Sequence, residues 1–211
     1  MAAIPTESEV RALVSRVVAG LRTETADSAS SPTPSPTSTP APNAASEVAT
    51  SGSLPTIAVG ADHGGYPLKE RIGFRLRELG HEVVDCGTHS ADAVDYPDFA
   101  HAVAQAVARG EATYGIVVDG AGIGSAMVAN KVPGIRAALC YDISSARNSR
   151  EHNHANVLTL GAGLVGASLA LQIVDAWLAT PWAPGRHANR VSKITDVEQL
   201  YVAGNYTRSA S

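Results

Sequence analysis

The feature that most constrains this fold is a regular alternation of short apolar runs and helical segments between residues 56 and 195. The apolar runs are typical of strands, and the segments between them repeat apolar residues at helical spacing. Strands are expected at Ile57–Val59, His81–Asp85, Gly115–Val118, Ile135–Cys140 and Val157–Leu160. Helices are expected at Leu68–Leu79, Tyr96–Arg109, a segment ending at Asn130, Ser144–Glu151 and Val165–Leu178. This order predicts an α/β domain whose parallel sheet is covered by helices on both faces.

A second feature is the composition of residues 23–55, which Ala, Ser, Thr and Pro dominate. Proline lacks the amide hydrogen that helices and sheets need, and the segment has too little apolar surface to offset the entropy of ordering. We therefore expect a disordered, extended linker. The chain divides into a helix (1–22), this linker (23–55), the α/β domain (56–195) and a C-terminal tail (196–211).

The segment before the linker has the pattern of an isolated amphipathic helix. Thr6 and Glu9 are spaced as in a capping box. Apolar residues then form one stripe at helical spacing: Val10, Leu13, Val14, Val17, Val18 and Leu21. No continuous apolar run of the kind found in signal peptides is present. A free helix of this length needs a groove that buries its stripe, on its own domain, on another copy or on a different partner.

Composition and charge exclude several classes of function. The chain has 211 residues and a formal net charge of −4. That charge argues against a general nucleic-acid or membrane-surface binder. The two cysteines, Cys86 and Cys140, are too few for a disulfide framework or a zinc site, and they favour a cytosolic context. We expect no metal.

Two groups of polar or glycine residues follow expected strands directly. Asp62 and His63 come after the first strand, and Asp119 comes after the third. Asp119 is followed by a loop with glycine at three alternate positions, Gly120, Gly122 and Gly124. Such a loop before a helix offers backbone N–H groups to an oxyanion or phosphate, although it is also a common tight turn. Asp119 has a second interpretation as a helix N-cap.

Two further groups lie near the fifth strand and the C-terminus. His152 and Asn153 precede the fifth strand, and Arg186 and Arg190 are spaced to share one face of a helix. Two guanidinium groups so placed can clamp a phosphate, or they can form an ordinary solvated surface. Acids, a histidine, an oxyanion loop and an arginine pair together suit proton transfer on a phosphorylated sugar.

Five stretches together resemble the ribose-5-phosphate isomerase B / galactose-6-phosphate isomerase family. They are Gly60–Gly65, Asp95–Pro97, Ala129–Ala137, Arg150–Asn153 and Gly185–His187. The resemblance covers Ile57 to Thr195 and does not extend to residues 1–55. It implies a Rossmann-like three-layer sandwich with a five-stranded parallel sheet, and an aldose–ketose isomerisation through a cis-enediolate without metal or cofactor.

The resemblance also implies roles for individual residues. Asp62 and His63 would contact the substrate, His152 would assist ring opening, and Asn153 would hold the enediolate oxygens. Arg186 and Arg190 would bind the phosphate. The loop of Gly120, Gly122, Gly124 and Ser125 would donate N–H groups to the enediolate. Because the family's sites lie between subunits, a homodimer or a dimer of dimers with shared active sites is implied.

Four positions depart from the family pattern. Many members have Cys where this chain has Asp119, and another branch has Glu where this chain has Ser125. Asp119 is therefore our expected base. A hydroxyl residue of the family is replaced by Ala121, and an arginine often found after the fifth strand is replaced by Gly163.

We expect an isomerase that interconverts ribose 5-phosphate and ribulose 5-phosphate. A four- or six-carbon sugar phosphate is an alternative substrate, and a catalytically inactive sugar-phosphate-binding shell cargo is an alternative function, motivated by Ala121 and Gly163. The short helix with its Pro/Ser-rich linker resembles the encapsulation peptides of bacterial microcompartments. Residues 4–22 are accordingly expected to bind a shell protein, which would place the enzyme in the bacterial cytoplasm inside a microcompartment.

Overall fold

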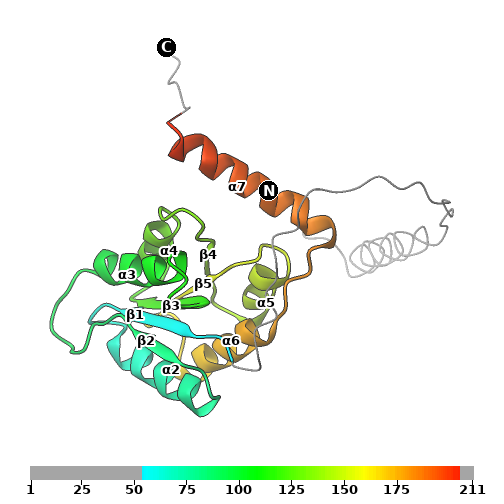
Figure 1. The fold of residues 1–211 in the computed structure, drawn as a ribbon. Coiled ribbons are helices and arrows are strands. Elements are labelled where there is room, and N and C mark those ends of the chain that lie inside the picture. Colours follow the sequence, from blue (N-terminus) through cyan, green and yellow to red (C-terminus); the bar gives the residue numbers. More distant parts are fainter. Residues whose placement is uncertain (1–53, 205–211) are drawn as a thin grey trace, which may run out of the picture. The chain divides into compact units, whose positions relative to one another are not determined.

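The computed structural model describes residues 54–204, which contain a five-stranded sheet flanked by helices (Figure 1). The strands are β1 (Ile57–Ala61), β2 (Val83–Asp85), β3 (Tyr114–Asp119), β4 (Ala137–Leu139) and β5 (Val157–Gly161). The helices are α2 (Tyr66–Glu78), α3 (Tyr96–Ala108), α4 (Ile123–Ala129), α5 (Ile143–Glu151), α6 (Ala167–Ala179), the 3₁₀ turn η1 (Gly185–His187) and α7 (Ala188–Val202). Every strand pairing is parallel, in the order β2-β1-β3-β5-β4. The predicted α/β fold is confirmed.

Two apolar cores, one on each face of the sheet, produce the three layers. Successive side chains of a strand point to opposite faces. Ile57 and Val59 therefore pack with the buried side chains of α2, α5 and α6. Ala58 between them packs with those of α3 and α4. The three central strands β1, β3 and β5 are buried on both faces, and this is why they read as continuous apolar runs.

The parallel topology gives the sheet two chemically distinct edges. The register pairs Ala61 of β1 with Val118 of β3, and Asp119 of β3 with Gly161 of β5. The carboxyl ends of the three central strands thus lie side by side, and we call this end the carboxyl edge. Each connecting helix runs antiparallel to the strands, so the C-terminal end of α5 lies beside the first residues of β5. We call that end the amino edge.

The C-terminal helix differs most from expectation. The predicted domain boundary at residue 195 falls inside α7, which continues to Val202. No Gly or Pro interrupts residues 188–202, and the helix ends only before Gly204, which has a φ of 67°. Strands β2 and β4 are shorter than expected, with three residues each.

The predicted N-terminal helix and nearly all of the predicted linker lie outside the described residues. Within residues 54–204, no helix combines the length and the apolar character needed to cross a bilayer.

Candidate functional site

The carboxyl edge of β1 carries Asp62 and His63, as the sequence predicted. Asp62 begins the turn into α2, where its Oδ1 accepts a hydrogen bond of 2.8 Å from the N–H of Gly65. The backbone N–H of Asp62 donates to the carbonyl of Val118, so the turn is fixed to β3. His63 is exposed, and its Nδ1 lies 3.1 Å from the carbonyl oxygen of Val94. Asp62 therefore lies beside the end of β3, and His63 follows it in the turn.

Asp119, at the end of β3, is buried inside the glycine loop that follows it. Its side chain is 4% exposed. Oδ1 accepts hydrogen bonds from the N–H groups of Ala121, at 2.8 Å, and Gly122. Oδ2 accepts from the N–H of Ser125 at 3.1 Å and from its hydroxyl at 2.5 Å. A carboxylate has about four lone-pair positions, so the loop itself occupies the acceptor capacity of Asp119.

The loop conformation depends on glycine at two positions. Gly122 has a φ of 77°, a left-handed conformation that residues with a Cβ rarely adopt. A Cβ on Gly124 would lie 2.4 Å from Cζ of Tyr96 and 2.6 Å from its hydroxyl oxygen. Tyr96, the first residue of α3, is thus pressed against the loop. Asp119 accepts hydrogen bonds from the N–H groups of Gly122 and Ser125, whereas it does not contact those of Gly120 and Gly124. The assignment of this loop to the substrate stays a prediction.

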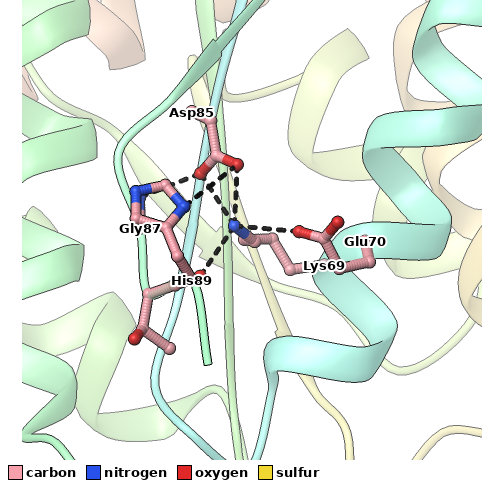
Figure 2. A network of polar contacts seen from close by, with 6 residues as sticks. Lys69, Glu70, Asp85, Gly87 and His89 are labelled. Atoms are coloured by element: carbon pink, nitrogen blue, oxygen red, sulfur yellow. Dashed lines mark hydrogen bonds and ion pairs between the residues drawn. The ribbon is translucent and has the colours of Figure 1, made fainter. Parts of the chain in front are cut away.

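An ion pair between Lys69 and Asp85 holds the start of the loop after β2 (Figure 2). Lys69 of α2 is 1% exposed, and its Nζ lies 2.7 and 2.9 Å from the two carboxylate oxygens of Asp85. Nζ also donates to the carbonyl of Thr88 at 2.8 Å, and the N–H of Thr88 donates to the carbonyl of Ala61. The residue preceding Asp62 is therefore tied to this ion pair.

Asp85 has a lowered pKa despite its partial burial. Burial alone would raise the pKa of Asp85. Hydrogen bonds from Lys69 and from the N–H of Gly87, together with the positive charge of Lys69, outweigh that effect and bring the pKa below its ordinary value.

The amino edge carries His152 and Asn153, which follow the last turn of α5. The Nδ1 of His152 lies 2.8 Å from the amide nitrogen of Asn148, one turn earlier. The amide nitrogen of Asn153 lies 3.4 Å from the side-chain oxygen of the same Asn148. The two predicted catalytic residues thus share one neighbour, which the sequence interpretation did not single out.

The segment of η1 brings the predicted phosphate ligands to His152. The rings of His152 and His187 are stacked, with centroids 4.1 Å apart and an angle of 6° between their planes. Nε of Arg186 lies 3.5 Å from Nε2 of His187. Burial lowers the pKa of His187, and the charges of His152, Arg186 and Arg190 lower it further. The nearby positive charges make this a surface suited to an anion.

The predicted site residues therefore form two groups that one chain does not bring together. Asp62, His63, Asp119 and the glycine loop lie at the carboxyl edge, and His152, Asn153, Arg186 and Arg190 lie at the amino edge. β3 has six residues between the edges, so at 3.3 Å per residue the groups are about 16 Å apart along the strand. Within residues 54–204, no cluster of three or more His, Cys, Asp or Glu side chains could hold a metal ion.

Three residues near these groups were not among the predicted site residues. Tyr96 belongs to the Asp95–Pro97 motif, but only the structure shows its ring against Gly124. Asn148 precedes His152 by four residues, and that spacing on a helix was a usable signal. Lys69 gave no signal, since its helical position alone does not reveal that Asp85 lies beside it.

Comparison with known proteins agrees with the fold and with these motifs. The family model described as Ribose/Galactose Isomerase matches residues 57–194. Ribose-5-phosphate isomerase B of Escherichia coli (strain K12) is 50% identical over 143 residues, which are 68% of this chain and 96% of that protein.

The solved structures that this chain resembles are also ribose-5-phosphate isomerases. The ribose-5-phosphate isomerase B of Clostridium thermocellum matches with a TM-score of 0.68 and 54% identity, over 69% of this chain and 99% of that one. A ribose 5-phosphate isomerase of Thermotoga maritima matches with a TM-score of 0.66 and 46% identity, over 67% and 98% of the two chains. The chain therefore belongs to the Ribose/Galactose Isomerase family.

Proposed function

We propose that this chain is a metal-independent aldose–ketose isomerase that interconverts ribose 5-phosphate and ribulose 5-phosphate. The observation that carries the proposal is the stack of His152 on His187. It joins a histidine able to move protons to the segment that holds Arg186 and Arg190, in a family whose similar members are named ribose-5-phosphate isomerases.

The proposed roles of the residues are divided between the two edges of the sheet. At the amino edge, Arg186 and Arg190 bind the phosphate, His152 exchanges a proton with the ring oxygen to open the sugar, and Asn153 holds the enediolate oxygens. At the carboxyl edge, Asp62 and His63 contact the sugar and the glycine loop donates N–H groups, for which Gly120 and Gly124 remain suited.

Asp119 is the proposed base that moves the proton between C2 and C1. Its four hydrogen bonds set a condition on this role, because a base needs an open lone pair. Three of the donors are backbone N–H groups fixed by the loop, and the fourth is the Ser125 hydroxyl. Only that hydroxyl can rotate away without moving the backbone. We propose that its rotation exposes Oδ2 to the substrate proton.

A complete site on this proposal needs two copies of the chain. Proton transfer requires heavy atoms within about 3 Å of each other, whereas the two groups of one chain lie about 16 Å apart along β3. A two-fold dimer can place the amino edge of one copy against the carboxyl edge of the other, and its symmetry then makes two equal sites. We therefore propose a homodimer, or a dimer of dimers, with shared active sites.

Two exposed apolar surfaces support this assembly. Helix α7 buries none of its residues and exposes Ile194 and Val197. Helix α4, which follows the glycine loop, exposes Ile123 and Met127 along a groove that Leu139 also lines. Exposed apolar patches of this kind are typical of interfaces, and a second copy that covered α4 would lie next to the carboxyl-edge group.

The decisive experiment is solvent-deuterium incorporation into candidate sugar phosphates. In D₂O, we expect deuterium at C2 of ribose 5-phosphate and at C1 of ribulose 5-phosphate. Comparison of kcat/KM across four-, five- and six-carbon sugar phosphates tests the substrate, and a higher value for another length would replace ribose 5-phosphate. Absence of exchange with every sugar would refute the isomerase.

The role of Asp119 has its own test. Asp119→Asn should slow exchange by roughly 100-fold or more, the usual contribution of a general base. Binding of ribitol 5-phosphate, which has no carbonyl and cannot isomerise, should persist and show that the site is intact. Ser125→Ala should keep exchange within a few-fold of wild type. Equal exchange rates for wild type and Asp119→Asn would make the assignment wrong.

The enclosure of Asp119 also favours a second candidate function, a catalytically inactive sugar-phosphate-binding protein. A carboxylate that only anchors its own loop would leave the chain without a base, while Arg186 and Arg190 would still bind a phosphate. Tight binding of ribose 5-phosphate without turnover or exchange for any sugar would establish this function instead.

We further propose that the enzyme is cargo of a bacterial microcompartment in the cytoplasm, addressed by residues 4–22. The support is the amphipathic pattern of that segment and the Pro/Ser-rich composition that follows it. Residues 1–22 fused to a fluorescent reporter should enter co-expressed shells, and the same fusion with Leu13 and Val17 changed to Glu should not. A diffuse reporter, under conditions in which known cargo is captured, would refute the proposal.

A further inference from the structure

One side chain, that of Asn148, contacts both residues to which the proposed function assigns chemistry at the amino edge. Asn148 lies on α5, one helical turn before His152. Its amide nitrogen is 2.8 Å from Nδ1 of His152. Its amide oxygen is 3.4 Å from the amide nitrogen of Asn153, which also lies 3.5 Å from the backbone carbonyl of Asn148.

The direction of these hydrogen bonds determines where His152 carries its proton. The NH₂ group of Asn153 can only donate, so the side-chain oxygen of Asn148 accepts from it. The NH₂ group of Asn148 is then the side that faces His152. Nδ1 of His152 must accept this bond and therefore carries no proton, so the neutral ring holds its proton on Nε2.

A second histidine and charges of both signs lie around the ring of His152. His187 covers one face at 4.1 Å between centroids, and its Nε2 accepts from Nε of Arg186, so His187 is neutral as well. The positive charges of Arg186 and Arg190 act on His187 and lower its pKa, after the larger effect of its burial. On its own helix, the carboxylate of Glu151 lies 3.9 Å from Nε2 of His152 and adds a negative charge beside the ring.

We infer that Asn148 is a positioning residue that holds His152 in the Nε2–H tautomer and aligns the amide of Asn153. This inference rests on the proposed function, in which His152 exchanges a proton with the ring oxygen of the sugar. With Nδ1 engaged by Asn148 and one face covered by His187, Nε2 is the nitrogen left to face the ring oxygen. Ring opening then begins with a neutral imidazole of defined tautomer, whose Nε2–H donates a hydrogen bond to that oxygen.

The sharpest test replaces the donor with an acceptor of the same shape. In Asn148→Asp, the carboxylate can still accept from Asn153 but can only accept from His152, so Nδ1 of His152 must carry a proton. We expect kcat for ribose 5-phosphate to fall by roughly 10- to 100-fold, a part of the usual general acid–base contribution. KM should change less than about twofold, because the phosphate ligands are untouched. The acid limb of the pH profile of kcat/KM should move to higher pH, since the new negative charge favours protonated His152.

Two further variants separate tautomer control from a purely structural effect. Asn148→Leu keeps the bulk but removes the donor without adding charge, so kcat should fall while the acid limb stays in place. Ser144→Asp adds the same charge to an exposed position one turn earlier on α5. It should change neither kcat nor the acid limb.

Nitrogen-15 NMR of the full-length free protein gives a readout that needs no activity. His152 signals, assigned with His152→Gln, should show a protonated Nε2 and an unprotonated Nδ1 in wild type, and the reverse or a doubly protonated ring in Asn148→Asp. A wild-type spectrum with the proton on Nδ1 would overturn the inference, even if Asn148→Asp failed to fold. A wild-type pH profile for Asn148→Asp would overturn it as well. Absence of turnover by wild type with every sugar phosphate would instead refute the proposed isomerase. The NMR result would then decide the role of Asn148.

Discussion

Two inactive variants of this protein should restore activity when combined, provided that their substitutions lie at opposite edges of the sheet. The expectation follows from the distance of about 16 Å along β3 between the group around Asp119 and the group around His152. If each site combines one group from each of two copies, Asp119→Asn damages both sites of its own dimer, and so does His152→Gln. A mixed dimer instead has one site with both substitutions and one site with neither.

The size of the recovery can be calculated from the symmetry. Co-expression in equal amounts gives mixed dimers as about half of the population, and each of these has one intact site of two, so activity should return to about one quarter of wild type. The assay is isomerisation of ribose 5-phosphate by co-expressed chains carrying different affinity tags. Tandem purification isolates the mixed dimers, whose activity should rise to about half of wild type.

Pairs of substitutions at the same edge provide the matched control. Asp119→Asn combined with Asp62→Ala, or His152→Gln combined with Arg186→Ala, leaves one group damaged in every site. These pairs should therefore show no recovery beyond the activity of the separate variants. Recovery in the same-edge pairs, or none in the opposite-edge pair despite isolated mixed dimers, would refute the shared site.

Three further predictions concern stability and assembly. Lys69→Met should destabilise the protein by about 2–3 kcal/mol, somewhat less than for a fully buried pair because Asp85 is 28% exposed. Because the folded pKa of Asp85 is lowered, its contribution is present above the ordinary pKa of 3.8 and is lost as pH falls through the folded value. The difference between wild type and Lys69→Met in urea unfolding should therefore shrink below about pH 3.8, and a constant difference would contradict the linkage. Val197→Glu on α7 should shift the protein towards monomer in sedimentation and lower activity with it. Ile173→Ala, at a fully buried position, should cost about 2–5 kcal/mol in the same unfolding assay with little change in kcat.

The fold was predictable because its signals are local and repeated. Each central strand is buried on both faces, so the continuous apolar run at Val157–Leu160 has no competing surface interpretation. The extent of α7 was less predictable. Its apolar residues at Ile194 and Val197 contact no core within the described residues, so the usual sign of a packed helix is weak there.

The candidate site residues were chosen by side-chain chemistry, and only the family resemblance implied that the site is shared between subunits. Asp119 comes directly after a strand, whereas His152 comes before one. In a parallel sheet these positions belong to opposite edges, so the order of elements already separated the two groups. Side-chain chemistry alone does not show this separation, and the proposed shared sites would join the two groups across two copies.

Hydrogen-bond partners were beyond prediction because they depend on distances of a few tenths of an ångström between segments far apart in the chain. The sequence shows Asp119 and Ser125 six residues apart, but not that the loop folds back so that the hydroxyl meets the carboxylate at 2.5 Å. That contact changes the chemical question about Asp119, because an acid after a strand is a candidate base only while one of its lone pairs is open. Three of the four hydrogen-bond donors to Asp119 are backbone N–H groups that the loop holds in place. Whether Asp119 can act as a base, or only anchors the loop, therefore depends on the hydroxyl of Ser125.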